Sequence, residues 1–156
     1  MTPLERVTRL GKHFGIGNLW VKNETVSLSG SFKDRGAMVA VREAIHGGFR
    51  RVLTASSGNA GAALAAYAAR AGVEAAVVVD PVAPPEKLRQ IRDGADIHTV
   101  EGLFNQPSET FIEQLTQMAR ERDAYLAFFW EPVNRAIIQA AVTRDALVGR
   151  TKNSGA

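Results

Sequence analysis

The chain contains no cysteine, which excludes disulfide frameworks, thiolate nucleophiles and cysteine-ligated metal sites. Histidine is scarce as well. His13, His46 and His98 stand far apart and none is flanked by a ligand pattern, so no metal site is expected. Apolar runs are short, and none is long enough to cross a bilayer. The first ten residues carry charged side chains in place of an apolar signal sequence, so we expect a cytoplasmic protein.

The motifs of several large enzyme classes are also missing. The sequence has no P-loop G-x-x-x-x-G-K-S/T, no dinucleotide signature G-x-G-x-x-G and no nucleophile elbow G-x-S-x-G. The formal net charge is only +3, and the cations are scattered among acids on the expected helix faces. Such charges are typical of a solvated surface, so we expect neither a nucleic-acid nor a membrane partner.

What the sequence does have is a regular alternation of strand and helix patterns. With 156 residues, 46% of them hydrophobic and 22% charged, a folded core is expected. From residue 51 onward, short apolar runs alternate with helical spacings, the first two of which end at Gly72 and Gly94. The expected strands and helices are 52–55, 60–71, 75–79, 86–93, 97–100, 108–122 and 125–129. This order predicts an α/β fold: a parallel, doubly wound sheet in three layers, α/β/α.

One lysine lies in an unusual setting before this alternation begins. Ser31 can cap a helix, and Asp34 three positions later completes a capping-box pattern, so Lys33 is expected in the first helical turn. The positive end of the helix dipole favours the uncharged, nucleophilic amine there. A solvated lysine at a helix start is the alternative. The apolar face of this helix is expected at Met38, Val41 and Ile45.

A second polar stretch follows the first strand of the alternating region. Residues 56–61 read Ser-Ser-Gly-Asn-Ala-Gly and connect the expected strand 52–55 to the helix 60–71. The free backbone N–H groups of such a loop and helix start can hold a carboxylate or a phosphate. Asn59 adds a side-chain donor and acceptor. Because ligands of parallel sheets bind beyond the carboxyl ends of the strands, this loop is a candidate site.

Three motifs in this order carry a family resemblance. Thr-Pro-Leu at 2–4, Ser-Gly-Ser-Phe-Lys-Asp-Arg-Gly at 29–36 and the stretch at 56–61 resemble the fold type II (tryptophan-synthase-β-like) pyridoxal-phosphate enzymes. Within that superfamily, the sequence looks most like threonine synthase and next most like threonine dehydratase. The similarity runs from residue 2 to about residue 132. The motif around Lys33 is the more specific of the signals.

The resemblance implies a role for individual residues. Lys33 would bind pyridoxal phosphate covalently and later move protons on an amino-acid substrate. Phe32 would pack near the cofactor, and Asn59 would hydrogen-bond its ring hydroxyl. Asp34 and Arg35 match the motif but are interpreted as helix-start and surface charges. The loop implied to bind the substrate carboxylate consists of Ser56, Ser57, Gly58, Asn59 and Ala60.

The reaction implied is that of a lyase of amino-acid biosynthesis, which converts O-phosphohomoserine to threonine and phosphate. A serine/threonine dehydratase is the alternative enzyme, and a catalytically inactive α/β module is the alternative outside enzymes. We expect a partial enzyme with three parts: an N-terminal segment with the Lys33 helix (1–50), a small α/β domain (51–132) and a divergent or frayed tail (133–156), in which 135–148 could be helical.

The expectation of a partial enzyme has consequences for the isolated chain. Relatives continue into a larger part that supplies the loop for the cofactor phosphate and the group facing the pyridine nitrogen, and no substitute for either is recognisable here. The first 50 residues would normally pack on that part. We therefore expect weak cofactor binding, little or no activity, and either aggregation or self-association through apolar side chains left uncovered, namely Phe32, Met38, Val41 and Ile45.

Overall fold

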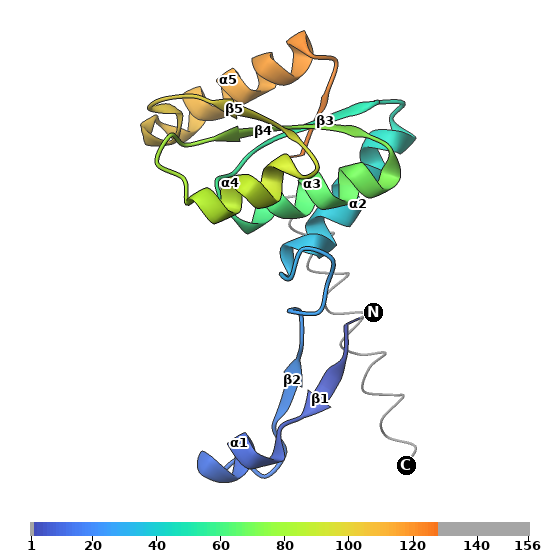
Figure 1. The fold of residues 1–156 in the computed structure, drawn as a ribbon, viewed down its shortest axis with the longest axis vertical. Helices are drawn as coiled ribbons and strands as arrows, with labels where there is room; N and C mark the ends of the chain where they lie inside the picture. The colour runs from blue at the N-terminus through green and yellow to red at the C-terminus, as the bar shows by residue number, and fades with distance from the viewer. Residues whose placement is uncertain (1, 128–156) are drawn as a thin grey trace.

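The computed structural model describes residues 2–127 (Figure 1). Its strands are β1 (Leu4–Arg6), β2 (Trp20–Lys22), β3 (Arg51–Ala55), β4 (Glu74–Val79), β5 (Asp96–Thr99) and β6 (Tyr125–Leu126). Its helices are α1 (Thr8–His13), α2 (Lys33–His46), α3 (Asn59–Ala71), α4 (Pro85–Arg92) and α5 (Ser108–Glu121), with a short 3-10 helix, η1 (Leu103–Asn105). Each strand and helix expected within these residues is present, with bounds shifted by at most a few residues.

The main sheet is parallel throughout and has the strand order β5-β4-β3-β6. Val52 pairs with Ala75 of β4, and Leu53 pairs with Leu126 of β6. The predicted parallel sheet is therefore confirmed for residues 51–127. The last two residues of the predicted fourth strand, and the expected helix at 135–148, lie outside the described residues.

Helices cover both faces of this sheet, as the three-layer prediction requires. The helices α2, α3 and α4 lie on one face and α5 lies on the other (Figure 1). Successive side chains of β3 pack on opposite faces of the sheet: Val52 packs with Leu64 of α3, whereas Leu53 packs with Leu115 of α5. The alanines of α3 bring this helix close to the sheet because they add little bulk.

The direction in which successive strands are added to the sheet reverses at β3. The chain moves outward from β3 through α3 and β4 to α4 and β5 on one side, and α5 then returns it to β6 on the other side of β3. Ligands of doubly wound sheets bind at the carboxyl ends of the strands where the direction reverses. The loop 56–58 follows β3 directly, so it lies at this position.

Gly61 lets α3 start against the sheet. A Cβ atom on Gly61 would lie 2.5 Å from the carbonyl oxygen of Ser56 and 3.0 Å from the Val77 side chain. Only glycine therefore permits this close approach of the helix to the loop that precedes it. The other end of α3 stops at Gly72, whose φ of 70° is left-handed.

The N-terminal part forms a small unit of its own. β1 and β2 pair as an antiparallel hairpin, and α1 lies in the connection between them. The hairpin stands away from the main sheet (Figure 1). The helix α2 that follows packs on α3 through Ala40, Val41 and Ala44. By these contacts α2 belongs to the α/β layers, although the expected segment 1–50 grouped it with the hairpin. The division into domains stays a prediction.

The expected apolar face of α2 is correct in part. Met38 and Ile45 are half exposed, at 50% and 51%, but Val41 is 4% exposed and belongs to the core. The helix is apolar on more than one side, and the side with the small residues is the one that packs on α3. Of the described helices, none has the length and apolar character needed to cross a membrane.

Candidate functional site

Lys33 is the first residue of α2, as the sequence predicts. Its Nζ lies 4.9 Å from the ring centroid of Phe32, whose side chain is 52% exposed. Among residues 2–127, Nζ has no hydrogen-bond or ion-pair partner. The amine therefore lies over an aromatic ring and forms no hydrogen bond to the described residues. It is available to react with a carbonyl compound.

The capping box expected at this helix start is wrong. The N-cap position is Phe32, and no side chain caps the helix. Asp34 instead accepts a hydrogen bond from the backbone N–H of Ser29 at 2.9 Å and another from the Ser29 hydroxyl. Asp34 is 2% exposed and not a solvated helix-start charge. It folds the loop before Lys33 back onto the helix, which sequence spacing alone did not indicate.

Arg35 was interpreted as a surface charge, and this too is wrong. Arg35 is only 9% exposed, and its Nε and NH2 groups donate to the two carboxylate oxygens of Glu24 at 2.9 and 2.8 Å. The same NH2 donates to Thr2 Oγ1 at 3.0 Å. The arginine lowers the pKa of Glu24, because its hydrogen bonds favour the carboxylate over the protonated form, while burial opposes this in part.

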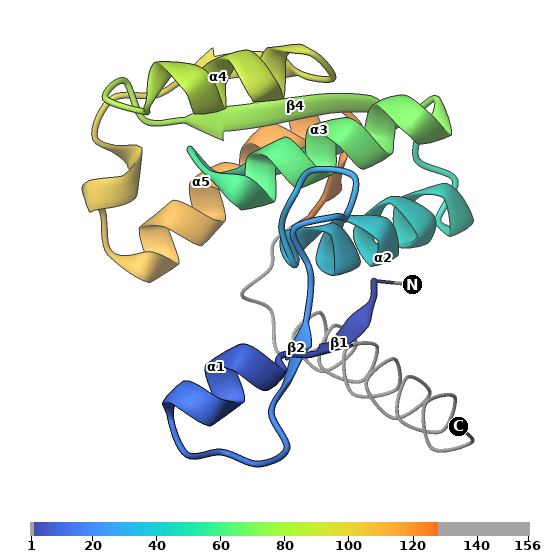
Figure 2. The same cartoon turned by 60° about the horizontal axis from the view of Figure 1, so that its bottom comes forward.

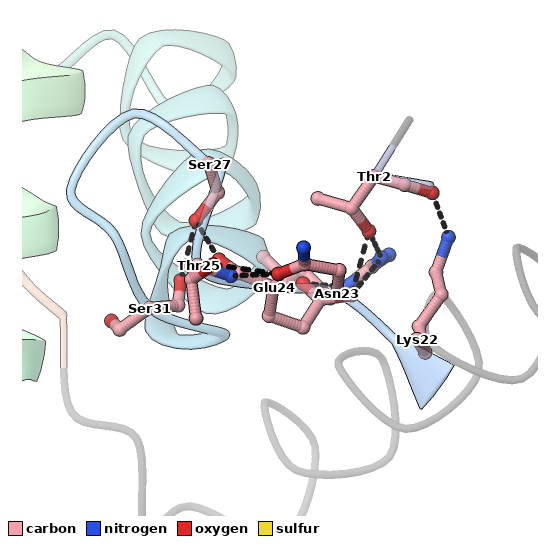
Figure 3. Close-up of polar contacts among 8 residues, drawn as sticks. Thr2, Lys22, Asn23, Glu24, Thr25, Ser27 and Ser31 are labelled. Carbon is pink, nitrogen blue, oxygen red and sulfur yellow. Dashed lines mark hydrogen bonds and ion pairs between the residues drawn. The ribbon is translucent and has the colours of Figure 1, made fainter. Parts of the chain in front are cut away.

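This ion pair connects three segments near Lys33. Thr2 Oγ1 also donates to Glu24 at 2.7 Å, and Lys22 Nζ donates to the Thr2 carbonyl oxygen (Figure 3). The Ser27 hydroxyl donates to the carbonyl oxygens of Glu24 and Ser31, at 2.7 and 3.0 Å. Sequence reasoning did not single out Glu24. The structure makes it the centre of the network that supports the lysine loop.

The loop after β3 is anchored to the neighbouring strand. The Ser56 N–H donates to the Val78 carbonyl oxygen at 2.9 Å, and the Asp80 N–H donates to the Ser57 hydroxyl at 2.8 Å. The hydroxyl of Ser56 accepts from the N–H of Gly58 at 3.3 Å. Both serine hydroxyls therefore accept hydrogen bonds from backbone N–H groups of the loop and its neighbour. Each hydroxyl can still donate its own proton to a further acceptor.

The N-terminus of α3 is open. Gly58 is the N-cap and offers no side-chain cap. Among the described residues, the N–H groups of Asn59, Ala60 and Gly61 have no acceptor, whereas that of Ala62 donates to the Gly58 carbonyl oxygen. Uncapped N–H groups at the positive end of a helix are suited to a carboxylate or phosphate. The predicted anion loop thus has free donors where the sequence expected them.

A residue that sequence reasoning missed joins the two motifs. Lys87 of α4 donates from Nζ to Asn59 Oδ1 at 2.6 Å and to Gln90 Oε1 at 3.3 Å. Gln90 Nε2 in turn donates to the carbonyl oxygen of Ser29 at 3.2 Å. The Ser29 loop and the Asn59 loop are therefore linked through α4. No local signal marked these two residues, because they lie 28 and 61 positions from their partners.

The starts of α2 and α3 lie on the same side of the molecule. The two helices run side by side in the same direction, with their N-termini at the end toward which the strands point (Figure 2). The helices that begin at Lys33 and at Asn59 therefore both start at the carboxyl edge of one parallel sheet. An amine, a set of free N–H groups and an amide side chain are combined there, which suits a ligand with a reactive carbonyl and an anionic group.

A family model for pyridoxal-phosphate dependent enzymes matches residues 1–145 of the sequence. The chain belongs to the pyridoxal-phosphate dependent enzyme family. Pyridoxal phosphate is the cofactor of this family, and the expected resemblance is thereby confirmed, together with the α/β fold of its fold type II members.

The relatives of this family member include several threonine synthases. The enzyme of Methanocaldococcus jannaschii is 39% identical over 127 residues, which is 80% of this chain and 30% of that protein. The enzyme of Mycobacterium bovis is 42% identical over 106 residues, which is 67% of this chain and 29% of that protein. The chain thus spans about 30% of the length of these curated relatives.

Solved structures of the same superfamily resemble the fold. A pyridoxal 5'-phosphate-dependent aspartate racemase superimposes with a TM-score of 0.77 at 28% identity, over 94% of this chain and 45% of that chain. Maize serine racemase superimposes with a TM-score of 0.68 at 27% identity, over 81% of this chain and 37% of that chain. These neighbours catalyse reactions other than threonine synthesis, so the fold alone does not select a substrate.

The described residues fit the aldehyde and the ring oxygen of the family's cofactor. Pyridoxal phosphate carries an aldehyde, a ring oxygen and a phosphate dianion. Lys33 Nζ is an amine without a partner among residues 2–127, and the Asn59 side chain is exposed beside the open end of α3. A covalent bond from Lys33 and a hydrogen bond from Asn59 are both chemically available. The α3 terminus has N–H donors for one anionic group.

Proposed function

We propose that the chain forms the part of a threonine synthase that carries the cofactor lysine and the substrate-carboxylate loop. The observation that carries this proposal is that α2, which begins at Lys33, and α3, with its open N-terminus, start at the same edge of the parallel sheet. The threonine synthases at 39–42% identity support the choice of reaction within the family. The whole reaction consumes O-phosphohomoserine and water and yields threonine and phosphate, and as a biosynthetic reaction it would take place in the cytoplasm.

Each residue of the site then has a defined task. Bound pyridoxal phosphate supplies the electron sink that makes protons on the substrate carbons acidic. Lys33 Nζ holds the cofactor and afterwards takes protons from the substrate carbons and returns them. The N–H groups at the start of α3, with the loop Ser56–Ala60, bind the substrate carboxylate and orient the substrate. Phe32 packs beside the cofactor and limits the access of water to Lys33 Nζ.

The cofactor lysine is tested by chemical trapping. The 156-residue chain is incubated with pyridoxal phosphate, reduced with borohydride and mapped by peptide mass spectrometry. The pyridoxyl group should be found on Lys33, and Lys33→Ala should abolish this label. A label confined to Lys22 or Lys87 would contradict the assignment.

The contact of Asn59 with the cofactor ring is tested by spectroscopy. Asn59→Ala should shift the visible absorbance of the bound cofactor and weaken its binding, while the far-UV circular dichroism stays that of the wild type. An unchanged spectrum together with unchanged affinity would exclude a ring contact.

The substrate is tested by assaying two products in parallel. Release of phosphate from O-phosphohomoserine identifies a threonine synthase, whereas release of ammonia from L-serine or L-threonine identifies a dehydratase that uses the same lysine and loop. We expect phosphate as the product and slow turnover by the chain alone. Cofactor that is bound without any turnover would support a binding module that is not an enzyme by itself.

A further inference from the structure

Lys87 makes contacts that decide how two amide side chains are oriented. Its Nζ lies 2.6 Å from one terminal atom of Asn59 and 3.3 Å from one terminal atom of Gln90. The nitrogen and oxygen of an amide have nearly the same shape, so their positions are normally inferred from the hydrogen-bond network. Here the network leaves one solution, because an ammonium group has three donors and no acceptor. The atoms that face Lys87 must be Asn59 Oδ1 and Gln90 Oε1.

The consequence for Asn59 is that its acceptor is occupied and its donor remains. Nδ2 has no acceptor among residues 2–127, and the side chain is exposed at the start of α3. Any ligand that contacts Asn59 from the open side of the loop therefore meets an N–H donor. A ligand oxygen can satisfy this group only as an acceptor.

The consequence for Gln90 is that its donor is directed at the loop before Lys33. With Oε1 on Lys87, Nε2 donates to the Ser29 carbonyl oxygen at 3.2 Å. The N–H and hydroxyl of Ser29 are in turn held by Asp34. One lysine on α4 thereby fixes the orientation of Asn59 and, through Gln90, supports the loop that leads to Lys33.

We propose that Lys87 is a positioning residue of the cofactor site. It fixes the Asn59 amide so that Nδ2 is the donor offered to the ring oxygen of pyridoxal phosphate, and it ties the lysine loop to α4 through Gln90. The first half of this statement rests on the proposed role of Asn59, whereas the orientation of the two amides and the tie to α4 do not.

The orientation is tested in the cofactor-free chain by NMR of the side-chain NH2 groups. Lys87→Met keeps the aliphatic stem and removes the donors. It should shift the NH2 signals of Asn59 and Gln90 and leave that of Asn23, which donates to Glu5, unchanged. Lys87→Arg retains donors and should restore much of the wild-type spectrum. Lys12→Met, on α1, is the matched control and should shift neither signal.

The effect on the cofactor is tested by titrating the same variants with pyridoxal phosphate. Lys87→Met should weaken the apparent affinity about three- to tenfold, the range expected for one hydrogen bond. It should also shift the visible absorbance of the bound cofactor in the direction seen for Asn59→Ala. Asn59→Asp keeps an acceptor for Lys87 but has no donor, so it should weaken binding at least as much. Lys87→Arg should be close to wild type, and Lys12→Met should equal it.

The outcomes separate this inference from the proposed function. Unchanged NH2 signals of Asn59 and Gln90 in Lys87→Met would overturn the positioning role, whatever the titration shows. Shifted signals with unchanged affinity and absorbance would overturn the link to the cofactor. If the wild-type chain bound no pyridoxal phosphate, or Lys33→Ala bound it equally well, the proposed function would fail, while the NMR result would still decide the role of Lys87.

Discussion

Arg35 and Glu24 form a two-pronged ion pair that joins the start of α2 to the end of the β1–β2 hairpin. The Nε and NH2 groups of Arg35 reach the two oxygens of Glu24 at 2.9 and 2.8 Å, and the side chains are only 10% and 19% exposed. Arg35 also donates to Thr2, so both ends of the hairpin are held next to the loop that carries Lys33. Planar, bidentate pairing of this kind depends on the guanidinium group.

Removing one partner of this pair should destabilise the protein strongly. Arg35→Met leaves the Glu24 carboxylate mostly buried and without its main partner, which we expect to cost about 3–5 kcal/mol of unfolding free energy. Arg42→Met is the control, because Arg42 pairs with Glu43 at the surface, where the side chains are 69% and 40% exposed. It should change stability by less than about 1 kcal/mol. Urea unfolding followed by circular dichroism measures both, and equal effects would contradict the buried pair.

The same pair should make stability depend on pH. Arg35 lowers the pKa of Glu24 below its ordinary value of 4.5, so the folded state holds this proton less tightly than the unfolded state. The stabilisation is present above pH 4.5 and is lost as the pH falls from there through the folded pKa. Wild type should therefore lose more stability between pH 6 and pH 3 than Glu24→Gln does. Glu43→Gln should parallel the wild type, and identical slopes for all three proteins would contradict the assignment.

Gly61→Ala should damage the loop at the start of α3. The added Cβ would lie 2.5 Å from the Ser56 carbonyl oxygen and close to Val77, so the helix or the loop must move. We expect a loss of about 1–3 kcal/mol in stability and weaker cofactor binding. Gly17→Ala, where no heavy atom lies within 4 Å of the added Cβ, should be tolerated. Thermal unfolding compares the two variants, and a Gly61→Ala variant as stable as Gly17→Ala would show that the helix can shift freely.

Thr54→Val should stabilise the protein. Thr54 lies in β3 with 1% exposure, and its hydroxyl has no hydrogen-bond partner among residues 2–127. Replacing a buried, unsatisfied hydroxyl by a methyl group should add about 1 kcal/mol to the unfolding free energy. Thr116→Val is the control, since that hydroxyl donates to the Ile112 carbonyl oxygen at 2.7 Å, and it should be neutral or slightly destabilising. A loss of stability in Thr54→Val would indicate that the hydroxyl has a partner.

The exposed side of α2 should cause self-association. Phe32, Met38 and Ile45 are each about half exposed along this helix, and apolar surface of this kind favours contact between copies. Sedimentation velocity should show a weight-average mass that rises with concentration, and the double variant Met38→Glu/Ile45→Glu should reduce this rise. Val82→Glu, at an isolated loop residue that is 86% exposed, should leave it unchanged. A wild-type chain that stays monomeric at high concentration would contradict the prediction.

Several features could be predicted from the sequence because their signals are local. The alternation of apolar strands with helical spacings led to the parallel three-layer sheet, and glycine marked the ends of α2, α3 and α4. Lys33 was correctly placed in the first turn of a helix. The stretch 56–61 was correctly expected between a strand and a helix, with free N–H groups at the helix start. These properties depend on a few neighbouring residues, whose conformational preferences agree with the final fold.

Only the tertiary structure decided what the charged residues of the site do. Asp34 looked like a helix-start charge and Arg35 like a surface charge, because the local sequence does not show that the Ser29 loop folds back onto Asp34 or that Arg35 reaches Glu24, 11 positions away. Lys87 and Gln90 carried no signal, since their partners come from separate loops brought together by the sheet. Hydrogen bonds of polar side chains require specific distances and directions, and the packing of helices on the sheet sets these. The sequence by itself therefore determined where the lysine and the loop after β3 lie, and the packing of distant segments determined which side chains hold them in place.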